Sequence, residues 1–276
     1  MKRDASTSKG YPEAVVDAVL ALAAPRGRPC LIAISGLQGS GKSTLAAQLV
    51  TAAGRRGDFA LALSIDDFYF SRSDRRRLAR SVHPLLATRG VPGTHDVGLL
   101  MRTLDALGRA TADRAARLPR FDKGSDTRIA PSRWRRVTRS PALVVLEGWC
   151  VGVPPQRAPE LRRPINMLER DEDPDALWRT WVNDQLHERY VALWRRLDRL
   201  VLLQAPSYAV VRRWRDEQEL ALRRRRAPRA LSPEALRRFL MHYERLSRHA
   251  LRELPARSDL RVVLDARRRV RRIVCA

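Results

Sequence analysis

The sequence is short of the residues that build disulfide frameworks, zinc sites and membrane spans. Its 276 residues include only three cysteines, and Cys30, Cys150 and Cys275 lack the paired spacing of a metal site. No run of about 18 apolar residues is available to cross a bilayer. Glu13 and Asp17 interrupt the apolar stretch near the N-terminus, so we expect no signal peptide. These absences favour a protein of the reducing cytoplasm with no membrane association.

Lysine is also scarce, so the strong positive charge of the chain comes from arginine. Lysine and arginine together number 54 against 30 acidic residues, which gives a net charge of +24. A charge of this size suggests nucleic acid as a partner. The arginines are scattered among alanines, however, with clusters at Arg75–Arg77, Arg223–Arg226 and Arg267–Arg272. We expect solvated helix faces and phosphate contacts rather than a nucleic-acid surface.

What the sequence does contain is a glycine-rich loop between a predicted strand and a predicted helix. Residues Gly36–Thr44 have the spacing G-x-x-x-x-G-K-S-T and follow the apolar run Cys30–Ser35. In such a loop the backbone N–H groups point at phosphate oxygens, and the helix N-terminus adds its positive dipole end. Lys42 can reach the β- and γ-phosphates, and the Ser43 hydroxyl can bind Mg²⁺. The residues predicted to bind a nucleoside triphosphate are Gly36, Gly39, Ser40, Gly41, Lys42, Ser43 and Thr44.

Short apolar segments alternate with helical patterns along the rest of the chain. Further strands are expected at 59–65, 142–147, 199–204 and 261–265, the last of these ending the series. Helices are expected at 99–107, 175–196, 207–225 and 233–251. We expect 71–98 and 119–131 to be irregular loops with a functional role. The alternation predicts an α/β fold, a three-layer sandwich with a mostly parallel sheet and helices on both faces.

The first three predicted strands each end at residues that phosphoryl transfer requires. In open parallel sheets, ligands bind beyond the carboxyl ends of the strands. The glycine loop follows the first strand, Asp66 and Asp67 follow the second, and Glu147 ends the third. Asp66 can orient and deprotonate an attacking hydroxyl, and Glu147 can hold Mg²⁺ or its waters. The ordinary alternatives are a helix cap for the acidic pair and a solvated strand end for Glu147.

Five segments of the chain also form a recognisable set. They are Gly36–Thr44, Ser64–Tyr69, Arg89–Asp96, Pro119–Lys123 and Leu146–Gly152. Together they resemble the glycerate kinases of the P-loop superfamily, a group beside uridine kinase, phosphoribulokinase and pantothenate kinase. A weaker likeness at 164–169, 214–219 and 242–246 extends the resemblance to most of residues 30–250. The glycine loop is shared very widely, so the R-G-V-P-G-T-H-D stretch discriminates this family better.

The resemblance implies an ATP-dependent kinase that transfers the γ-phosphoryl group to a hydroxyl, with D-glycerate as the expected acceptor and Mg²⁺ as the metal. In the wider superfamily the acid that ends the second strand is the base, which falls on Asp66 rather than Asp67. The basic helix that contains Arg215 resembles the lid that closes over ATP in such kinases. A nucleoside, pantothenate or a sugar phosphate is the alternative acceptor. An ATP-dependent nucleic-acid-binding protein is the alternative from another class.

Glycerate carries a carboxylate, so its pocket is expected to offer cations or paired donors. The candidates for this acceptor site are Asp67, Arg89, His95, Arg120 and Lys123. Each has an ordinary alternative as a surface charge or a loop hydrogen bond. We expect a single domain over 1–276, with a core at about 28–70, 140–206 and 258–266. Within it, acceptor loops are expected at about 71–131 and a lid helix at about 207–226.

Overall fold

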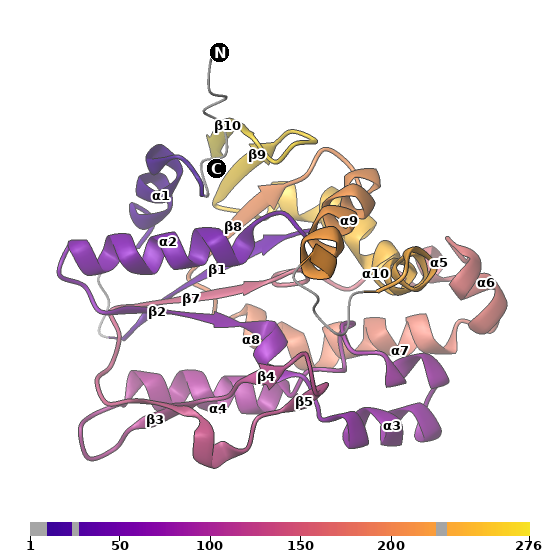
Figure 1. Cartoon of the computed structure of the whole chain (residues 1–276), viewed down its shortest axis with the longest axis horizontal. Coiled ribbons are helices and arrows are strands. Elements are labelled where there is room, and N and C mark those ends of the chain that lie inside the picture. The colour runs from indigo at the N-terminus through magenta and orange to yellow at the C-terminus, as the bar shows by residue number, and fades with distance from the viewer. Residues whose placement is uncertain (1–9, 24–27, 225–230) are drawn as a thin grey trace.

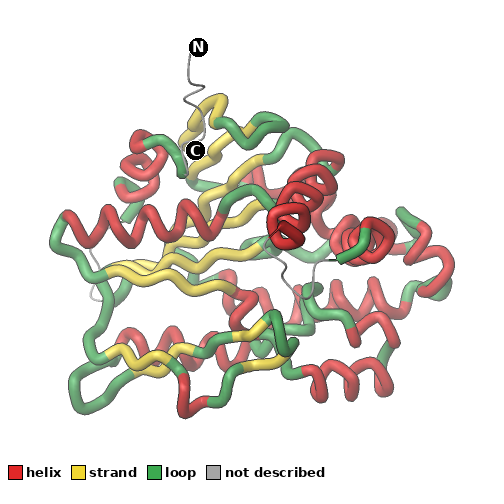
Figure 2. Tube along the Cα trace, viewed as in Figure 1, coloured by secondary structure: helices red, strands yellow, loops and turns green. Residues whose placement is uncertain are grey.

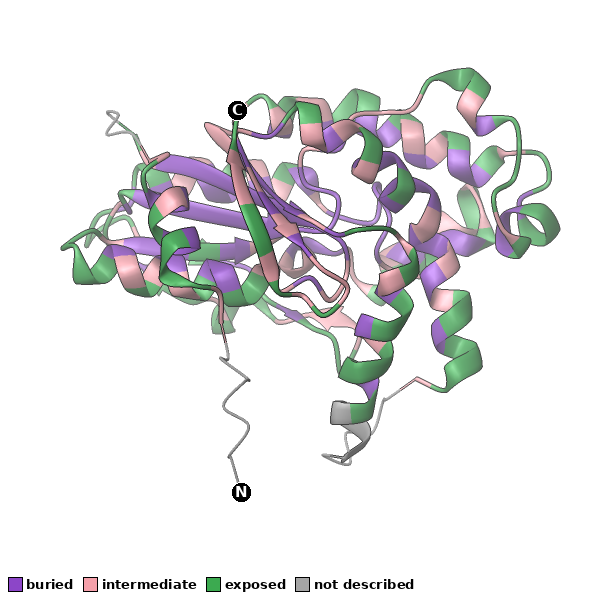
Figure 3. Ribbon diagram, turned by 90° about the horizontal axis from the view of Figure 1, so that it is seen from above, coloured by how far each residue is buried: buried purple, intermediate pink, exposed green. Residues whose placement is uncertain are grey.

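A six-stranded sheet forms the centre of the computed structural model, which describes residues 10–23, 28–224 and 231–276 (Figure 1). The strand order is β10-β9-β8-β1-β7-β2, and β10 pairs antiparallel to β9 while the other neighbours are parallel. The strands are β1 (Cys30–Gly36), β2 (Ala60–Ser64), β7 (Leu143–Gly148), β8 (Arg199–Gln204), β9 (Leu260–Leu264) and β10 (Val270–Cys275). β1 and β7 are buried along their whole length, as expected for parallel strands that are covered on both faces (Figure 3).

Helices cover both faces of this sheet, which confirms the predicted three-layer α/β architecture (Figure 2). One face packs on α1 (Glu13–Leu20) and α2 (Lys42–Arg55), together with residues of α9 (Ala209–Arg224) and α10 (Pro233–Glu253). The other face packs chiefly on α4 (Val97–Gly108), and on a π-helical turn (Leu186–Tyr190) with α8 (Val191–Trp194). Successive side chains of β1 point to opposite faces, so Ile32 joins the first core and Ala33 the second.

The long helix predicted at 175–196 is divided by that π-helical turn. It consists of α7 (Leu177–Gln185), the turn Leu186–Tyr190 and α8. Two short helices, α5 (Ala158–Leu161) and α6 (Met167–Glu172), precede it. The helix predicted at 207–225 corresponds to α9, while residues 225 and 226 of the expected lid lie outside the described residues. The side chains of the cluster Arg223–Arg226 lie outside them as well.

The prediction that 71–98 is irregular is wrong, because α3 (Arg72–Ser81) forms there. Its N-terminus is capped by Ser71, whose hydroxyl accepts a hydrogen bond from the Asp74 N–H at 3.1 Å. The residue that α3 buries is Arg75, which stands where an apolar side chain would be expected. A helix without an apolar stripe leaves no helical periodicity in the sequence. The sequence therefore contains the cap residue of α3 but lacks the apolar periodicity that predicts a helix.

The segment 119–131 and the C-terminus also contain strands that the sequence analysis missed. The hairpin β4 (Phe121–Asp122) and β5 (Thr127–Arg128) lies within the first, flanked by the pair β3 (Ala116–Leu118) and β6 (Arg135–Val137). β9 is not the last strand, since β10 follows it along the edge of the sheet. Exposed arginines of the cluster Arg267–Arg272 lie on β10, where charge hinders pairing with another chain. No helix among the described residues has both the length and the apolar character needed to span a membrane.

Candidate active site

The three predicted strand ends are neighbours, because β1, β7 and β2 are adjacent in the sheet. The parallel register pairs Glu147 of β7 with Ile34 of β1 on one side and with Ser64 of β2 on the other. The glycine loop leads from β1 into α2, and there the Ser43 hydroxyl donates a hydrogen bond to Glu147 Oε1 at 2.8 Å. Two side chains that are 104 residues apart in the sequence thus meet at the predicted edge.

The glycine loop is shaped by two left-handed glycines, Gly39 at φ +81° and Gly41 at φ +93°. A Cβ atom on Gly39 would lie 2.8 Å from the Cβ of Trp214, so α9 packs directly on the loop. Lys42 donates from Nζ to the Leu37 carbonyl at 3.0 Å. Burial lowers the pKa of Lys42, while the negative charge of Glu147 opposes this shift. Thr44 is exposed in the first turn of α2.

Asp66 and Asp67 follow β2 side by side but have different partners. Asp66 accepts hydrogen bonds from the Tyr69 hydroxyl at 2.9 Å and from Lys123 Nζ at 2.6 Å. Burial raises the pKa of Asp66, but the charge and hydrogen bond of Lys123 outweigh it, so that the pKa lies at about 2. Asp67 accepts from the Phe121 N–H at 3.1 Å, and burial raises its pKa. Asp66 is therefore paired with a cation, whereas Asp67 ties the β4–β5 hairpin to the segment that follows β2.

His95 is brought against Tyr69, within the electrostatic influence of Asp66, by backbone pairing between two loops. The Phe70 N–H donates to Thr94 O at 2.9 Å, and the Asp96 N–H donates to Phe68 O at 2.7 Å. The His95 ring consequently stacks on Tyr69, with 4.4 Å between the ring centroids. Burial lowers the pKa of His95 to about 4 although the charge of Asp66 opposes the shift, so the imidazole is neutral at pH 7.

The two remaining predicted acceptor residues, Arg89 and Arg120, differ in their contacts. Arg89 forms an ion pair with Asp126, whose second oxygen accepts from the buried Arg75 at 2.5 Å. The guanidinium of Arg89 lies 5.7 Å from the centroid of the Phe121 ring. Arg120 is exposed, and its carbonyl accepts the Ile129 N–H at 2.8 Å. Lys123 thus contacts Asp66, and Asp67 contacts the hairpin backbone, both close to the end of β2. Arg89 instead forms its ion pair with Asp126 of the hairpin.

Arg215, the residue expected to reach ATP from the lid, makes its hydrogen bonds within α9. Its guanidinium donates to Gln218 at 2.8 Å and to Glu219 at 2.6 Å. Glu219 in turn accepts the Leu231 N–H at 3.0 Å, which joins α9 to the segment before α10. In this conformation Arg215 braces the helix, while Trp214 beside it contacts the loop glycine.

Aromatic residues that the sequence analysis did not assign hold the Arg89–Asp96 loop. Trp149 Nε1 donates to Gly90 O at 3.0 Å, and the Tyr243 hydroxyl donates to Arg89 O at 2.9 Å. The Tyr190 hydroxyl accepts the Gly93 N–H at 3.0 Å. The position of Trp149 two residues after Glu147 was the sequence signal that could have pointed to one of them. Tyr243 lies in the segment 242–246, whose weaker family likeness was a second signal. Tyr190 had none, because an aromatic side chain on a helix resembles a core residue.

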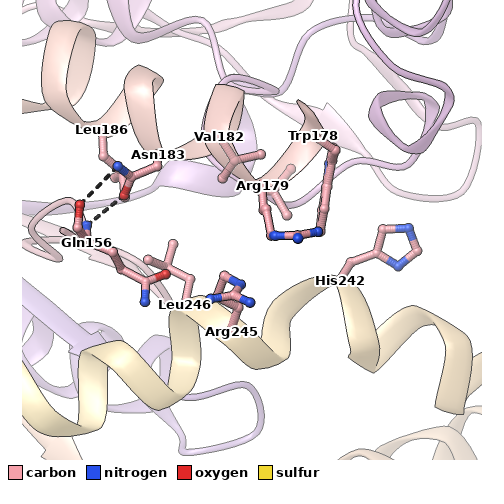
Figure 4. A pocket seen from close by; sticks show the side chains of 10 residues that line it. Gln156, Trp178, Arg179, Val182, Asn183, Leu186, His242, Arg245 and Leu246 are labelled. Atoms are coloured by element: carbon pink, nitrogen blue, oxygen red, sulfur yellow. Dashed lines mark hydrogen bonds between the residues drawn. The ribbon is translucent and has the colours of Figure 1, made fainter. Parts of the chain in front are cut away.

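A separate small cavity lies between α7 and α10 (Figure 4). Its volume is about 20 Å³, which is room for a single water. Its wall includes Arg179 and Arg245, which are buried and paired with Asp173 at 2.9 Å and Glu169 at 2.6 Å. Gln156 and Asn183 close one side through two hydrogen bonds. None of the predicted site residues lines it, and it is too small for an acceptor.

Comparison with known proteins identifies several relatives of the chain. No protein-family model matches it. The kinase mug58 of Schizosaccharomyces pombe, described as uncharacterized, is 35% identical over 226 residues, which cover 79% of this chain and 80% of that protein. The chloroplastic D-glycerate 3-kinase of Arabidopsis thaliana is 30% identical over 224 residues, which cover 78% of this chain. The match spans only 46% of the Arabidopsis protein, so the chain corresponds to about half of its length.

A solved structure shares the fold. The D-glycerate 3-kinase from Cryptococcus neoformans superposes with a TM-score of 0.77 over 96% of this chain and 98% of that one, at 24% identity. At this identity the match bears on architecture, and it confirms a P-loop α/β fold around the strand ends described above.

Proposed function

The chain belongs to the glycerate kinase-like family of P-loop kinases, and we propose that its acceptor is D-glycerate. The resemblance predicted from the five sequence segments is thereby confirmed, and the protein is an ATP-dependent phosphotransferase that acts on an alcohol group of a small molecule. The identity of the acceptor is supported by the name of the Arabidopsis relative and by the cationic side chain beside Asp66.

The observation that carries the proposal is the meeting of Asp66, Glu147 and the glycine loop at the ends of three adjacent strands. Phosphoryl transfer leaves little covalent chemistry to the protein, so positioning and charge dominate catalysis. We assign to Asp66 the role of the base that orients the attacking hydroxyl and receives its proton. Its low pKa keeps it ionised at neutral pH, which suits a residue whose main task is to orient the nucleophile.

We assign nucleotide binding to the glycine loop. Lys42 now donates to a carbonyl of its own loop and would turn to the β- and γ-phosphates of bound ATP. The backbone N–H groups of the loop would surround the phosphates. The residues proposed to bind ATP are Gly36, Gly39, Ser40, Gly41, Lys42, Ser43 and Thr44, with Arg215 from α9.

The Ser43 and Glu147 pair fits Mg²⁺, because both groups present oxygen atoms and lie within 2.8 Å of each other. Mg²⁺ prefers oxygen ligands, keeps several waters, and needs only one or two protein ligands beside the substrate phosphates. When bound, the ion neutralises charge that develops between the β- and γ-phosphates. Ser43 and Glu147 are therefore the proposed metal ligands.

For the carboxylate of glycerate, Lys123 is the strongest candidate on the hairpin. Its side chain is 61% exposed, and it contacts Asp66 without being locked into the core. We propose that it moves from Asp66 to the acceptor carboxylate, which frees Asp66 to accept the hydroxyl. Asp67 would hold the hairpin, while Arg89, His95 and Arg120 complete the proposed acceptor site.

An ADP-release assay with a set of acceptors tests this proposal. D-Glycerate should give the highest kcat/KM among D-glycerate, uridine, pantothenate and ribulose 5-phosphate. Glycerol is the matched control, because it has the hydroxyls and lacks the carboxylate, and it should be a poor acceptor. Preference for another member of the set would reject glycerate while keeping the kinase. Folded protein that binds ATP but shows no acceptor-dependent turnover with any of them would contradict the proposed function.

A further inference from the structure

His95 and Tyr190 form a buried hydrogen-bonded pair next to the candidate base. His95 is 2% exposed and Tyr190 is fully buried, and His95 Nδ1 lies 2.7 Å from the Tyr190 hydroxyl oxygen. Tyr190 is the last residue of the π-helical turn between α7 and α8. Such turns are rare and often occur at functional sites. The turn therefore puts a polar group of a core helix onto a loop histidine.

The direction of this hydrogen bond follows from counting protons. The Tyr190 oxygen already accepts the Gly93 N–H at 3.0 Å. A tyrosine hydroxyl has one hydrogen, and a buried hydroxyl needs an acceptor for it. Among the described residues, the ring nitrogen Nδ1 of His95 is the acceptor in contact with it. Tyr190 therefore donates to Nδ1, which must be the unprotonated nitrogen.

A neutral imidazole with a bare Nδ1 carries its hydrogen on Nε2. The reverse arrangement would leave two buried groups without a partner, the Tyr190 hydrogen and the Nε2 lone pair, whereas this arrangement leaves only the Nε2 hydrogen, which is less costly. The ring is neutral because burial lowers the pKa of His95 to about 4. The geometry and the charge state thus agree on the Nε2–H tautomer.

The second ring nitrogen of His95 is Nε2. It is buried, and among the described residues it has no hydrogen-bond partner. The ring to which it belongs stacks on Tyr69, whose hydroxyl donates to Asp66 at 2.9 Å. A fixed N–H donor beside Asp66 is suited to an oxygen atom of a bound molecule. Because His95 is neutral, it adds no second positive charge beside Asp66. A second cation would lower the pKa of Asp66 further and weaken it as a base.

We propose that Tyr190 is a positioning residue that holds His95 in the Nε2–H tautomer, and that this N–H donates a hydrogen bond to an oxygen of the acceptor beside Asp66. The contact with the acceptor rests on the proposed function, whereas the tautomer does not. A hydroxy acid suits this donor, because its hydroxyl and its carboxylate both present oxygen atoms.

The tautomer can be measured by ¹⁵N NMR of histidine-labelled protein, in which protonated and bare ring nitrogens give distinct shifts. His95→Gln assigns the His95 signals by their loss. The wild-type protein should show a hydrogen on Nε2, and Tyr190→Phe should move part of the population to Nδ1. A wild-type ring that carries its hydrogen on Nδ1 would overturn the proposal, whatever the protein phosphorylates.

The contact with the acceptor needs a second readout. D-Glycerate added with a non-hydrolysable ATP analogue should shift the Nε2–H signal, and no shift in protein that turns over glycerate would reject the contact. Tyr190→Phe should lower the acceptor kcat/KM about threefold to tenfold with the KM for ATP unchanged, as expected for one weakened hydrogen bond. His95→Gln keeps an N–H donor and should retain more activity than His95→Leu.

Tyr208→Phe is the matched control, because it removes a tyrosine hydroxyl that donates elsewhere, to the backbone carbonyl Leu240 O at 2.7 Å. It should change neither the His95 signals nor the acceptor kcat/KM. Equal losses for ATP and acceptor in Tyr190→Phe, with a lower Tm and unchanged His95 shifts, would show a structural role only. If no acceptor is turned over, the proposed function fails, and the tautomer measurement still decides the role of Tyr190.

Discussion

Lys123 Nζ lies 2.6 Å from Asp66 Oδ2, so a residue of the β4–β5 hairpin is paired with a residue of the short turn that follows β2. The Asp67 carboxylate fastens the same hairpin through the Phe121 N–H. The hairpin therefore approaches the strand ends through two neighbouring acids with different tasks. In the proposed site, an acceptor that takes the place of Lys123 at Asp66 would link acceptor recognition to exposure of the base.

Replacing Asp66 by Asn should remove most of the transfer reaction and leave ATP binding intact. A base of this kind contributes on the order of 10²–10⁴ in rate, so kcat should fall by about a thousandfold. Asp67→Asn is the control within the same loop, and it should affect the acceptor KM more than kcat, because Asp67 contacts the hairpin backbone. Rates come from the ADP-release assay and ATP affinity from calorimetry. Undiminished turnover in Asp66→Asn would remove Asp66 from the role of base.

Replacing Lys123 by Met should change the dependence of both activity and stability on pH. The pKa of Asp66 is depressed to about 2 from an ordinary 3.8, so its ionised form stabilises the fold above the ordinary value. This stability is lost as pH falls through the folded-state pKa. In Lys123→Met the pKa of Asp66 should rise, because burial then acts without the opposing cation. The acid limb of kcat should move to higher pH.

Melting curves between pH 2 and pH 7 check the stability part of this prediction. The Tm difference between wild type and Lys123→Met should be largest at neutral pH and shrink below pH 4. Arg120→Met serves as the control, since it removes a neighbouring exposed cation, whereas the ion pair of Asp66 is with Lys123. An acid limb that coincides in all three proteins would show that Lys123 does not set the charge state of Asp66.

Replacing Glu147 by Gln should raise the Mg²⁺ concentration needed for half-maximal activity. The amide keeps a hydrogen-bonding oxygen for Ser43 but loses the negative charge that attracts the ion. A shift of about tenfold is expected, with partial recovery at high Mg²⁺. Glu172→Gln is a suitable control, because Glu172 pairs with Arg238 on the surface. An unchanged Mg²⁺ titration in Glu147→Gln would assign the metal to other groups.

The sheet and its strand ends were predictable because buried parallel strands are continuously apolar and the glycine spacing is specific. Asp66 and Glu147 could be found in this way, since Asp66 comes shortly after β2 and Glu147 lies near the end of β7. The contacts that surround these two residues could not be predicted from the sequence. In α3 the buried position is occupied by Arg75, so the apolar periodicity that indicates a helix is missing. Tyr190 has the sequence pattern of an ordinary core residue of its helix. Contacts between loops, such as that of His95 with Tyr69, depend on tertiary pairing that no local pattern encodes.

Asp126 is the shared partner of two arginines that hold the β4–β5 hairpin, so its replacement should loosen the hairpin. Its carboxylate pairs with Arg75, whose side chain is 1% exposed, and with Arg89. Asp126→Asn leaves the buried guanidinium without a negative partner and should lower the free energy of unfolding by about 2 kcal/mol, less than for a fully buried pair because Asp126 is itself partly exposed.

Urea unfolding measures this loss, and the acceptor KM should rise with it because Lys123 belongs to the same hairpin. Asp171→Asn is the matched control, since its pair with Arg170 lies on the surface, and it should leave both quantities unchanged. If Asp126→Asn unfolds like the wild type, the contacts of the hairpin with Asp66, Asp67 and Asp96 are enough to hold it. If stability falls while the acceptor KM stays constant, the hairpin position is set independently of this ion pair, and Lys123 reaches Asp66 without its help.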